Sequence, residues 1–137
     1  MTENHPELLS KIIDRSPAVA FIWKLEDDWP VLYVSDNVSQ FGYSAEDLRA
    51  GKVLYRDIVH PEDSKRVASE IANFMREGVS EFVQQYRIIT ASGISRWVRD
   101  WTYIDLIDGF KSAQGIILDV TDEIDLKDRV FRIADSV

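Results

Sequence analysis

Residues 57–63 of the chain have the sequence DIVHPED, and this stretch predicts where a long helix begins. Proline is tolerated at the first position of a helix, and acids just after it face the positive end of the helix dipole. An apolar stripe then recurs along the chain at Val67, Ile71, Phe74 and Met75. Gly78 follows, a residue that favours a helix end. We therefore predict an amphipathic helix over 61–77 with one face turned to a core.

Outward from this helix, the apolar pattern changes to the two-residue period of strands. Five segments are predicted strands: 19–25, 31–34, 82–89, 97–106 and 112–121. Short helical signals lie between the second strand and the long helix, over 35–59. This order predicts an α+β domain with its helices gathered on one face of a sheet.

Both ends of the chain are predicted helices outside this core. Asn4 and Glu7 resemble a capping box ahead of an apolar stripe at Leu8, Leu9, Ile12 and Ile13. Leu126, Val130, Ile133 and Val137 follow a coiled-coil spacing, but for less than two heptads, so packing on the chain's own domain is an equal alternative. The predicted organisation is an N-terminal helix over 1–16, a core over 17–121 and the start of a further helix or linker over 122–137.

Composition excludes several classes of protein. The 137 residues carry 16 Lys and Arg against 24 Asp and Glu, a net charge of −8, without a polybasic block. We therefore expect neither nucleic acid nor a membrane surface as a partner. No apolar run is long enough to span a bilayer, and residues 1–6 do not have the pattern of a signal peptide, so we expect a cytoplasmic domain.

The sequence offers no set of residues for catalysis or metal binding. The only histidines are His5 and His60, and His60 precedes the predicted helix start, where a structural role is the better interpretation. Adjacent carboxylates fall in turns or first helical turns, where acids are expected for solvation and dipole reasons. The chain has no cysteine, and its six glycines stand singly. We expect a non-catalytic domain without a metal site.

The aromatic residues leave two interpretations open: a filled core, or a pocket for a flat or apolar ligand between sheet and helix. Alternation along the third strand places Gln84 on the face of Phe82, Tyr86 and Ile88. We therefore expect its amide to contact a ligand, a water or the polar tip of a Trp or Tyr inside the cavity. We take the following residues as the candidate pocket: Phe21, Trp23, Ile71, Phe74, Met75, Gln84 and Tyr86.

In this arrangement the chain resembles a PAS domain of the subgroup found in prokaryotic sensor kinases and cyclic-dinucleotide enzymes. The resemblance rests on four motifs in order: residues 33–48 (YVSDNVSQFGYSAEDL), 57–63 (DIVHPED), Tyr86-Arg87 through Gly93 to 96–98 (RWV), and Gly115 through 119–122 (DVTD). It covers about residues 8–125. Each motif alone is weak, whereas all four in this order are specific.

The resemblance implies a five-stranded antiparallel sheet of order 2-1-5-4-3 and a sensory or regulatory role within a larger signalling protein, such as a histidine kinase. It implies a homodimer linked to an output domain, with Asp119 and Thr121 at the junction that transmits the signal. We expect Asp119 to bind an Arg or Lys of a neighbouring element and Thr121 to cap the exit from the sheet. A ligand-free dimerisation domain with a filled core is the alternative function.

Residues that differ from those usual in the family narrow the range of possible ligands. Covalent flavin and coumaroyl chromophores need a cysteine, which is absent. Haem in relatives is bound through a histidine of the long helix, and residues 64–77 contain none, so haem is not expected. Non-covalent flavin or another small ligand stays open, and its identity is unknown.

Overall fold

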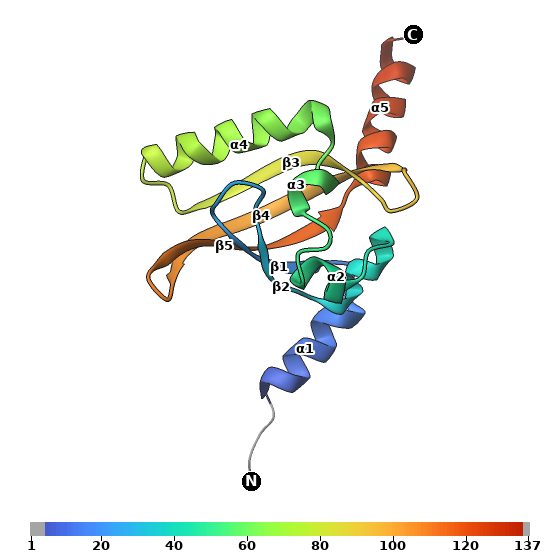
Figure 1. The fold of residues 1–137 in the computed structure, drawn as a ribbon. Helices are drawn as coiled ribbons and strands as arrows, with labels where there is room; N and C mark the ends of the chain where they lie inside the picture. Colours follow the sequence, from blue (N-terminus) through green and yellow to red (C-terminus); the bar gives the residue numbers. More distant parts are fainter. Residues whose placement is uncertain (1–4, 136–137) are drawn as a thin grey trace.

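The computed structural model describes residues 5–135, which fold into one sheet with helices on one face and at both ends (Figure 1). Along the chain the elements are α1 (His5–Arg15), β1 (Val19–Lys24), β2 (Val31–Val34), the 3₁₀ helix η1 (Asp36–Phe41), α2 (Ala45–Arg49), α3 (Tyr55–Ile58), α4 (Pro61–Arg76), β3 (Glu81–Ile89), β4 (Ser95–Ile107), β5 (Phe110–Asp119) and α5 (Thr121–Asp135).

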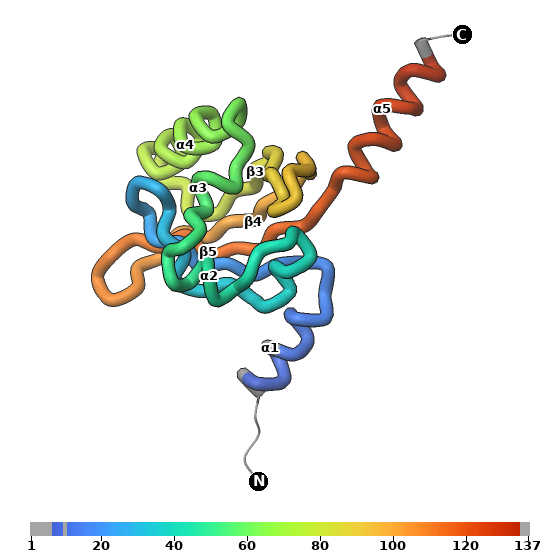
Figure 2. The backbone as a smooth tube through the Cα atoms, turned by 45° about the vertical axis from the view of Figure 1, so that its right-hand side comes forward, coloured from blue at the N-terminus to red at the C-terminus, as the bar shows by residue number. Residues whose placement is uncertain are grey.

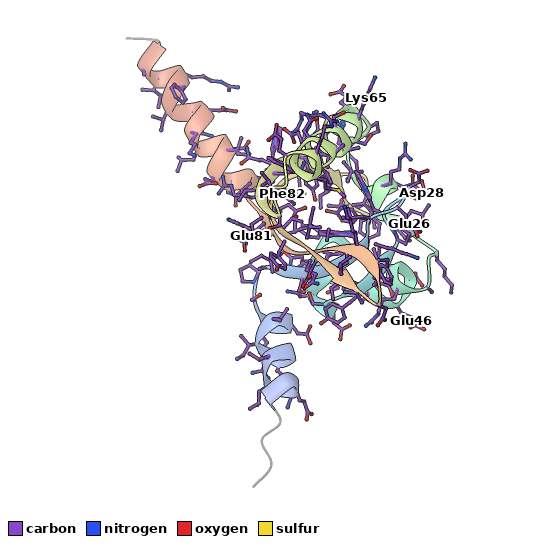
Figure 3. The ribbon with its side chains drawn as sticks, turned by 90° about the vertical axis from the view of Figure 1, so that its left-hand side faces the viewer. Glu26, Asp28, Glu46, Lys65, Glu81 and Phe82 are labelled. Atoms are coloured by element: carbon purple, nitrogen blue, oxygen red, sulfur yellow. The ribbon has the colours of Figure 1, made fainter. Side chains whose placement is uncertain are left out.

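The strands form one antiparallel sheet in the order β2-β1-β5-β4-β3, which confirms the predicted topology. The chain therefore returns to the centre of the sheet with its last strand. β5 pairs with both β1 and β4, so it joins the two hairpins. The core lies between the sheet and the helices α2, α3 and α4, and side chains fill this space (Figure 3).

The DIVHPED stretch starts α4 as predicted, and His60 has a structural role there. Its Nδ1 accepts the Glu62 backbone N–H at 3.1 Å, and Pro61 occupies the first turn. Asp63 is buried rather than solvated. It accepts the Arg87 backbone N–H at 2.8 Å and pairs with the Arg87 guanidinium at 2.7 Å. The hydrogen bonds from Arg87 hold the pKa of Asp63 below its usual value, against the opposing effect of burial. α4 is thus locked to β3 at its first turn.

Two predicted boundaries were wrong or fall outside the structure. The last strand ends at Asp119, and Thr121 is the first residue of α5 rather than the last of the strand. The backbone N–H of Ile124 donates to Val120, so the helix begins directly after the sheet. The proposed cap at Asn4 lies outside the described residues.

The two terminal helices extend away from the sheet in opposite directions (Figure 2). On α1, Leu8, Leu9 and Ile12 are all more than half exposed, and Leu126 and Val130 on α5 are too. Leu126 and Val130 are therefore not covered by the sheet, which contradicts the interpretation of α5 as a cap on its own domain. The stripe position at Val137 lies outside the described residues. Within residues 5–135, no helix combines the length and hydropathy that crossing a bilayer requires.

Candidate functional site

A chain of hydrogen bonds links three elements in the centre of the core. The Asp100 carboxylate, on β4, accepts the Tyr86 hydroxyl of β3 at 2.7 Å and the Thr102 hydroxyl at 2.8 Å. The Tyr86 hydroxyl in turn lies 2.7 Å from the Tyr55 hydroxyl of α3. Because Tyr86 donates to Asp100, its oxygen is free to accept the proton of Tyr55. We call these four residues the inner cluster.

Burial of the inner cluster changes its acid–base chemistry. Desolvation raises the pKa of Asp100 to about 6, although the hydrogen bonds from Tyr86 and Thr102 act in the opposite direction. Desolvation, with the charge of Asp100 next in size, raises the pKa values of Tyr55 and Tyr86 well above their usual range. Among the described residues no cation lines the cavity beside this carboxylate, whose pKa of about 6 lies close to neutral pH.

A glycine provides the space for this carboxylate. Gly115 lies opposite Thr102 where β5 pairs with β4. A Cβ at this position would overlap the Trp101 carbonyl oxygen and lie 3.2 Å from Asp100 Oδ1. Any side chain here would separate the two strands, so Gly115 fixes their close approach.

Aromatic rings form the wall next to the inner cluster. Phe21 and Trp23 stack with centroids 4.9 Å apart, and Tyr55 lies 5.0 Å from each of them. The Trp23 Nε1–H is buried and has no hydrogen-bond acceptor in the part of the chain that the structure describes. A buried donor without a partner is rare and unfavourable, so this N–H is available to an acceptor that enters the core.

The cavity bounded by this wall has a volume of about 20 Å³, room for about one water molecule. Four of the seven predicted pocket residues line it: Trp23, Ile71, Gln84 and Tyr86. Three do not. Phe21 stacks behind Trp23, Phe74 stacks on Phe82 with centroids 4.4 Å apart, and Met75 lies outside the lining. Non-covalent flavin does not fit this cavity, because ligand pockets are usually some hundreds of Å³.

Gln84 points into the core, as the alternation predicted, but its partners differ from those expected. Its amide donates to the Val67 carbonyl and to the Glu70 carboxylate of α4, both at 3.1 Å. The amide therefore joins β3 to the middle of the helix. The expected partner was a ligand, a water or the polar tip of a Trp or Tyr, and the observed partners belong to α4 instead.

Sequence reasoning missed the residues that complete the site. Asp100 and Thr102 occur on a strand whose two faces both carry mixed residues, so alternation gave no clear inward face. Tyr55 falls in a short helical segment without a stripe. Trp29 was assigned only to the turn at 26–30, yet its side chain lines the cavity. The one available signal was that a tryptophan is unusual in a charged turn.

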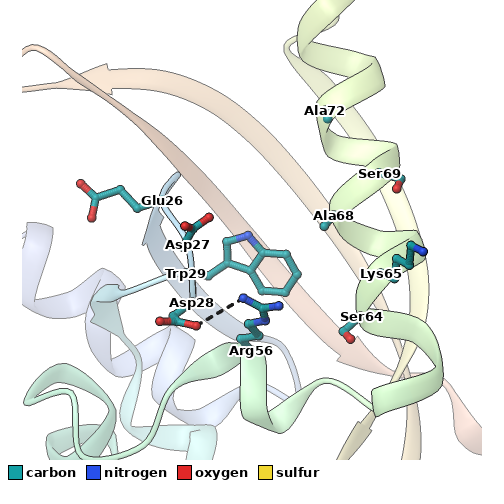
Figure 4. Close-up of a pocket in the computed structure, with 10 residues that line it drawn as sticks. All are labelled: Glu26, Asp27, Asp28, Trp29, Arg56, Ser64, Lys65, Ala68, Ser69 and Ala72. Atoms are coloured by element: carbon teal, nitrogen blue, oxygen red, sulfur yellow. Dashed lines mark hydrogen bonds and ion pairs between the residues drawn. The ribbon is translucent and has the colours of Figure 1, made fainter.

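A wider cleft of about 500 Å³ lies outside the cavity, between the β1–β2 loop and α4. Figure 4 shows its residues: Glu26, Asp27, Asp28 and Trp29 from the loop, Arg56 from α3, and Ser64, Lys65, Ala68, Ser69 and Ala72 from α4. Trp29 lines both spaces. Its indole therefore separates the solvent-filled cleft from the core.

The junction between the sheet and α5 is built around Asp119. Its carboxylate accepts Arg96 Nε of β4 at 2.7 Å and the Thr121 backbone N–H at 2.9 Å. Burial favours a higher pKa for Asp119, but the bonds from Arg96 and Thr121 outweigh it, so the pKa lies below its usual value. Asp119 thus connects β4 to the first residue of α5.

Thr121 makes a different contact from the cap that was expected. Its hydroxyl accepts the Trp97 backbone N–H at 2.8 Å, which extends the β4–β5 ladder by one residue. Arg99 adds a third connection, because its guanidinium bonds Glu123 at 2.8 Å and Gln85 at 3.0 Å. The first turn of α5 is therefore fixed to β4 at several points.

Comparisons with known proteins agree with this fold. The sequence profile of the PAS fold matches residues 31–108. A methyl sulfide methyltransferase-associated sensor of Methanosarcina acetivorans is 38% identical over 122 residues, which is 88% of this chain and 12% of that protein. The chain therefore spans only a small part of this relative.

Two solved structures share the fold at low identity. One is a PAS domain of a protein from Colwellia psychrerythraea, with a TM-score of 0.70, 16% identity and coverage of 85% of this chain and 98% of that one. The other is a sensory box histidine kinase/response regulator from Burkholderia thailandensis, with a TM-score of 0.66, 20% identity and coverage of 97% and 96%. From the sheet order, the profile match and the sensor relative, we conclude that the chain belongs to the PAS fold family and is a sensory module of that family.

Proposed function

We propose that this domain is a non-catalytic regulatory module of a longer signalling protein, and that it converts an event at the inner cluster into a change at the start of α5. The observation that carries the proposal is the register of β4 against β5. Asp100 lies opposite Ile117, and Val98 lies opposite Asp119. Two residues of strand, about 7 Å, therefore separate the inner cluster from the junction.

The coupling follows from what each end contacts. A ligand or a proton that reaches Asp100 changes its bonds to Tyr86 of β3 and Thr102 of β4. Because Asp100 lies against Gly115, where β4 and β5 approach closely, we expect the position of β4 against β5 to change as well. Arg96 and Trp97 lie on the same strand and bond Asp119 and Thr121. Small shifts of a strand pair can thereby become shifts of the helix that follows.

α5 is a suitable carrier of such a signal. It leaves the sheet with Leu126 and Val130 exposed, so its apolar stripe needs a partner to cover it. In the proposed arrangement this partner is the same helix of a second copy, continued into an output domain. The output domain in this proposal is a histidine kinase, by analogy with the Burkholderia sensory box histidine kinase/response regulator.

The experiment that tests this function is Asp119→Ala, with Asp122→Ala as the matched control. Both residues are acids at the junction of β5 and α5, but of the two only Asp119 forms hydrogen bonds with Arg96 and the Thr121 N–H. In this chain, Asp119→Ala should speed hydrogen exchange in the first turn of α5 while the core strands stay protected. In the longer protein it should separate output activity from the signal.

Asp122→Ala should leave both the exchange pattern and the output unchanged. If Asp119→Ala signals normally, Asp119 has no part in transmission. If it melts the whole domain, its role is structural. A melting curve on the same variant separates these two cases.

A second candidate function is dimerisation by a domain with a filled core, and a specific observation favours it. The cavity has room for about one water molecule, while the outer face of the sheet carries a row of apolar side chains. Val83, Trp101 and Ile116 are neighbours by register and are all exposed. Covering this row with a second copy would bury it.

The measurement is the mass of the chain in solution by light scattering. The wild type should be a dimer, and Trp101→Glu, in the middle of the row, should be a monomer. Leu106→Glu is the control, because Leu106 is also exposed but lies at the far end of β4. A monomeric wild type would rule out the outer face as a dimer interface.

A further inference from the structure

The side chain of Trp29 closes the mouth of the inner cavity. Its indole extends from the β1–β2 loop toward α4, where the small residues Ala68 and Ala72 line the opposite side of the cleft (Figure 4). The indole is only partly buried, so one side of it faces the cleft and the other faces the core. Removing it would join the two spaces.

The loop that carries Trp29 is held in an unusual conformation. Asp28 and Trp29 have φ angles of 68° and 49°, the left-handed region that side chains other than glycine rarely adopt. The Trp29 N–H donates to the Glu26 carbonyl at 3.1 Å, and Asp28 pairs with Arg56 of α3 at 3.4 Å. The pair is more than half exposed, so water can replace it when the loop moves. The indole of Trp29 packs against the core, whereas the loop that carries it is held by a few contacts at the surface.

The walls behind the plug define what could take its place. Trp23, Tyr55, Val67, Ile71 and Ala113 give an apolar surface for a flat ring. Among the polar residues that line the cavity, Trp23 and Asp100 have hydrogen-bonding capacity to spare. The Trp23 N–H lacks an acceptor among the described residues, and a carboxylate accepts up to about four hydrogen bonds, so Asp100 can take more than the two it has.

The charged residues at the cavity and its mouth indicate which net charge a ligand can carry. Asp100 is the one ionisable group with a formal charge at neutral pH among the described residues that line the cavity. The loop at the mouth contributes Glu26, Asp27 and Asp28, and these face Lys65 and Arg56 across the cleft. Because Arg56 is paired with Asp28, the cleft offers an anion little to offset Asp100 inside.

We propose that Trp29 is a displaceable plug, and that the ligand which replaces it is a flat ring of about indole size, neutral or cationic, that donates a hydrogen bond to Asp100. A neutral ligand that carries an acceptor also takes the hydrogen bond of the Trp23 N–H, whereas a cation such as benzamidinium is held by Asp100 alone. Anionic ligands are excluded by the buried carboxylate. This inference rests on the proposed sensory function, since it specifies the ligand of the same site.

The test uses Trp29→Ala to open the cavity and three probes of one shape: benzamide, benzamidinium and benzoate. Each has as many non-hydrogen atoms as an indole ring, and they differ in charge: neutral, positive and negative. Trp101→Ala is the matched control, because it removes an exposed indole from the outer face of the sheet. Binding is followed by melting temperature and calorimetry at pH 8, where Asp100 is ionised.

Trp29→Ala should bind benzamide and benzamidinium, and at ten times Kd the melting temperature should rise by about 4 °C. Benzoate should bind at least about tenfold more weakly. The wild type and Trp101→Ala should bind all three probes more weakly than Trp29→Ala. In the double variant Trp29→Ala/Asp100→Asn, benzoate should approach the affinity of benzamide.

The proposal is overturned if Trp29→Ala is folded and binds none of the probes, if it binds benzoate as tightly as benzamide, or if Trp101→Ala gains the same binding. Where the double variant does not fold, the three probes on Trp29→Ala alone still decide. These are binding measurements on this chain. They are independent of the Asp119→Ala experiment. The proposed ligand site can therefore be refuted while signal transmission through Asp119 is supported, and transmission can be refuted while the ligand site is supported.

Discussion

Replacing Asp100 with asparagine should change how the stability of the domain depends on pH. In the native state the carboxylate is buried, and within residues 5–135 it accepts hydrogen bonds from the hydroxyls of Tyr86 and Thr102. Burial raises its pKa from 3.8 to about 6. Asparagine has nearly the same shape and carries no charge. Its amide can donate to the Tyr86 oxygen, with Tyr86 then donating to Tyr55, because either hydroxyl of that pair can be the donor.

The size of this change in stability follows from the pKa shift of Asp100. Between pH 3.8 and 6 the native state holds a proton that the unfolded state has released, so the free energy of unfolding falls as pH rises through this window. At about 1.4 kcal/mol per pKa unit, the full effect is about 3 kcal/mol. About 2 kcal/mol of it falls between pH 4 and pH 8. Below the window the charge has no effect on stability, and above it the destabilisation is constant.

The assay is urea unfolding of the wild type and Asp100→Asn at a series of pH values, followed by tryptophan fluorescence. The quantity of interest is the difference between the two proteins, because Asp63, Asp119 and Glu123 have lowered pKa values and act in the opposite direction in both. The free energy of unfolding of Asp100→Asn minus that of the wild type should rise by about 2 kcal/mol between pH 4 and pH 8. A difference that stays constant with pH would mean that water reaches Asp100 and that the carboxylate is not desolvated. A difference of opposite sign would mean that Tyr86 and Thr102 outweigh burial.

Two further substitutions test the packing around the site. Phe74→Ala should lower the free energy of unfolding, measured by urea titration, by about 1–3 kcal/mol. This is less than for a fully buried phenylalanine, because the ring is only partly buried and its main contact is the stack on Phe82. A loss within about 0.5 kcal/mol, typical of surface positions, would contradict this stack. Gly115→Ala should destabilise by about 3 kcal/mol, because its Cβ would overlap the Trp101 carbonyl. Gly93→Ala is the control, because a Cβ there meets open space and only the positive φ is strained, so it should lower the free energy of unfolding by about 1 kcal/mol. Equal losses of stability in Gly115→Ala and Gly93→Ala would refute the close approach of β4 and β5.

Much of the architecture could be predicted from the sequence, because its elements are marked by strong local signals. The DIVHPED stretch places a proline and two acids where a helix can use them, and α4 begins there. Alternation on β3 correctly turned Gln84 inward. The order of the strands was a different matter. It came from the family resemblance, since which strands pair across a sheet depends on contacts that no local pattern records.

The site was predicted less completely, because side-chain length and chain direction decide which residues meet. Phe74 is on the predicted face of α4, yet it lies toward the end of the helix and reaches Phe82 rather than the cavity. Trp29 lies in a charged turn, yet in a loop with two positive φ angles its side chain packs back against the core. Neither fact follows from hydrophobic periodicity.

The inner cluster shows most clearly why periodicity was insufficient. An acid at position 100 contradicts the apolar pattern of an inward face, so β4 appeared mixed on both sides. In the structure this contradiction is resolved by residues distant in sequence: Tyr86 supplies a donor, and Gly115 removes the side chain that would occupy the space. A polar group that conflicts with the local pattern and is accommodated by several partners is often found at functional sites. The failure of the pattern at Asp100, next to the strand pair that leads into α5, is therefore itself an argument for placing the origin of the signal there.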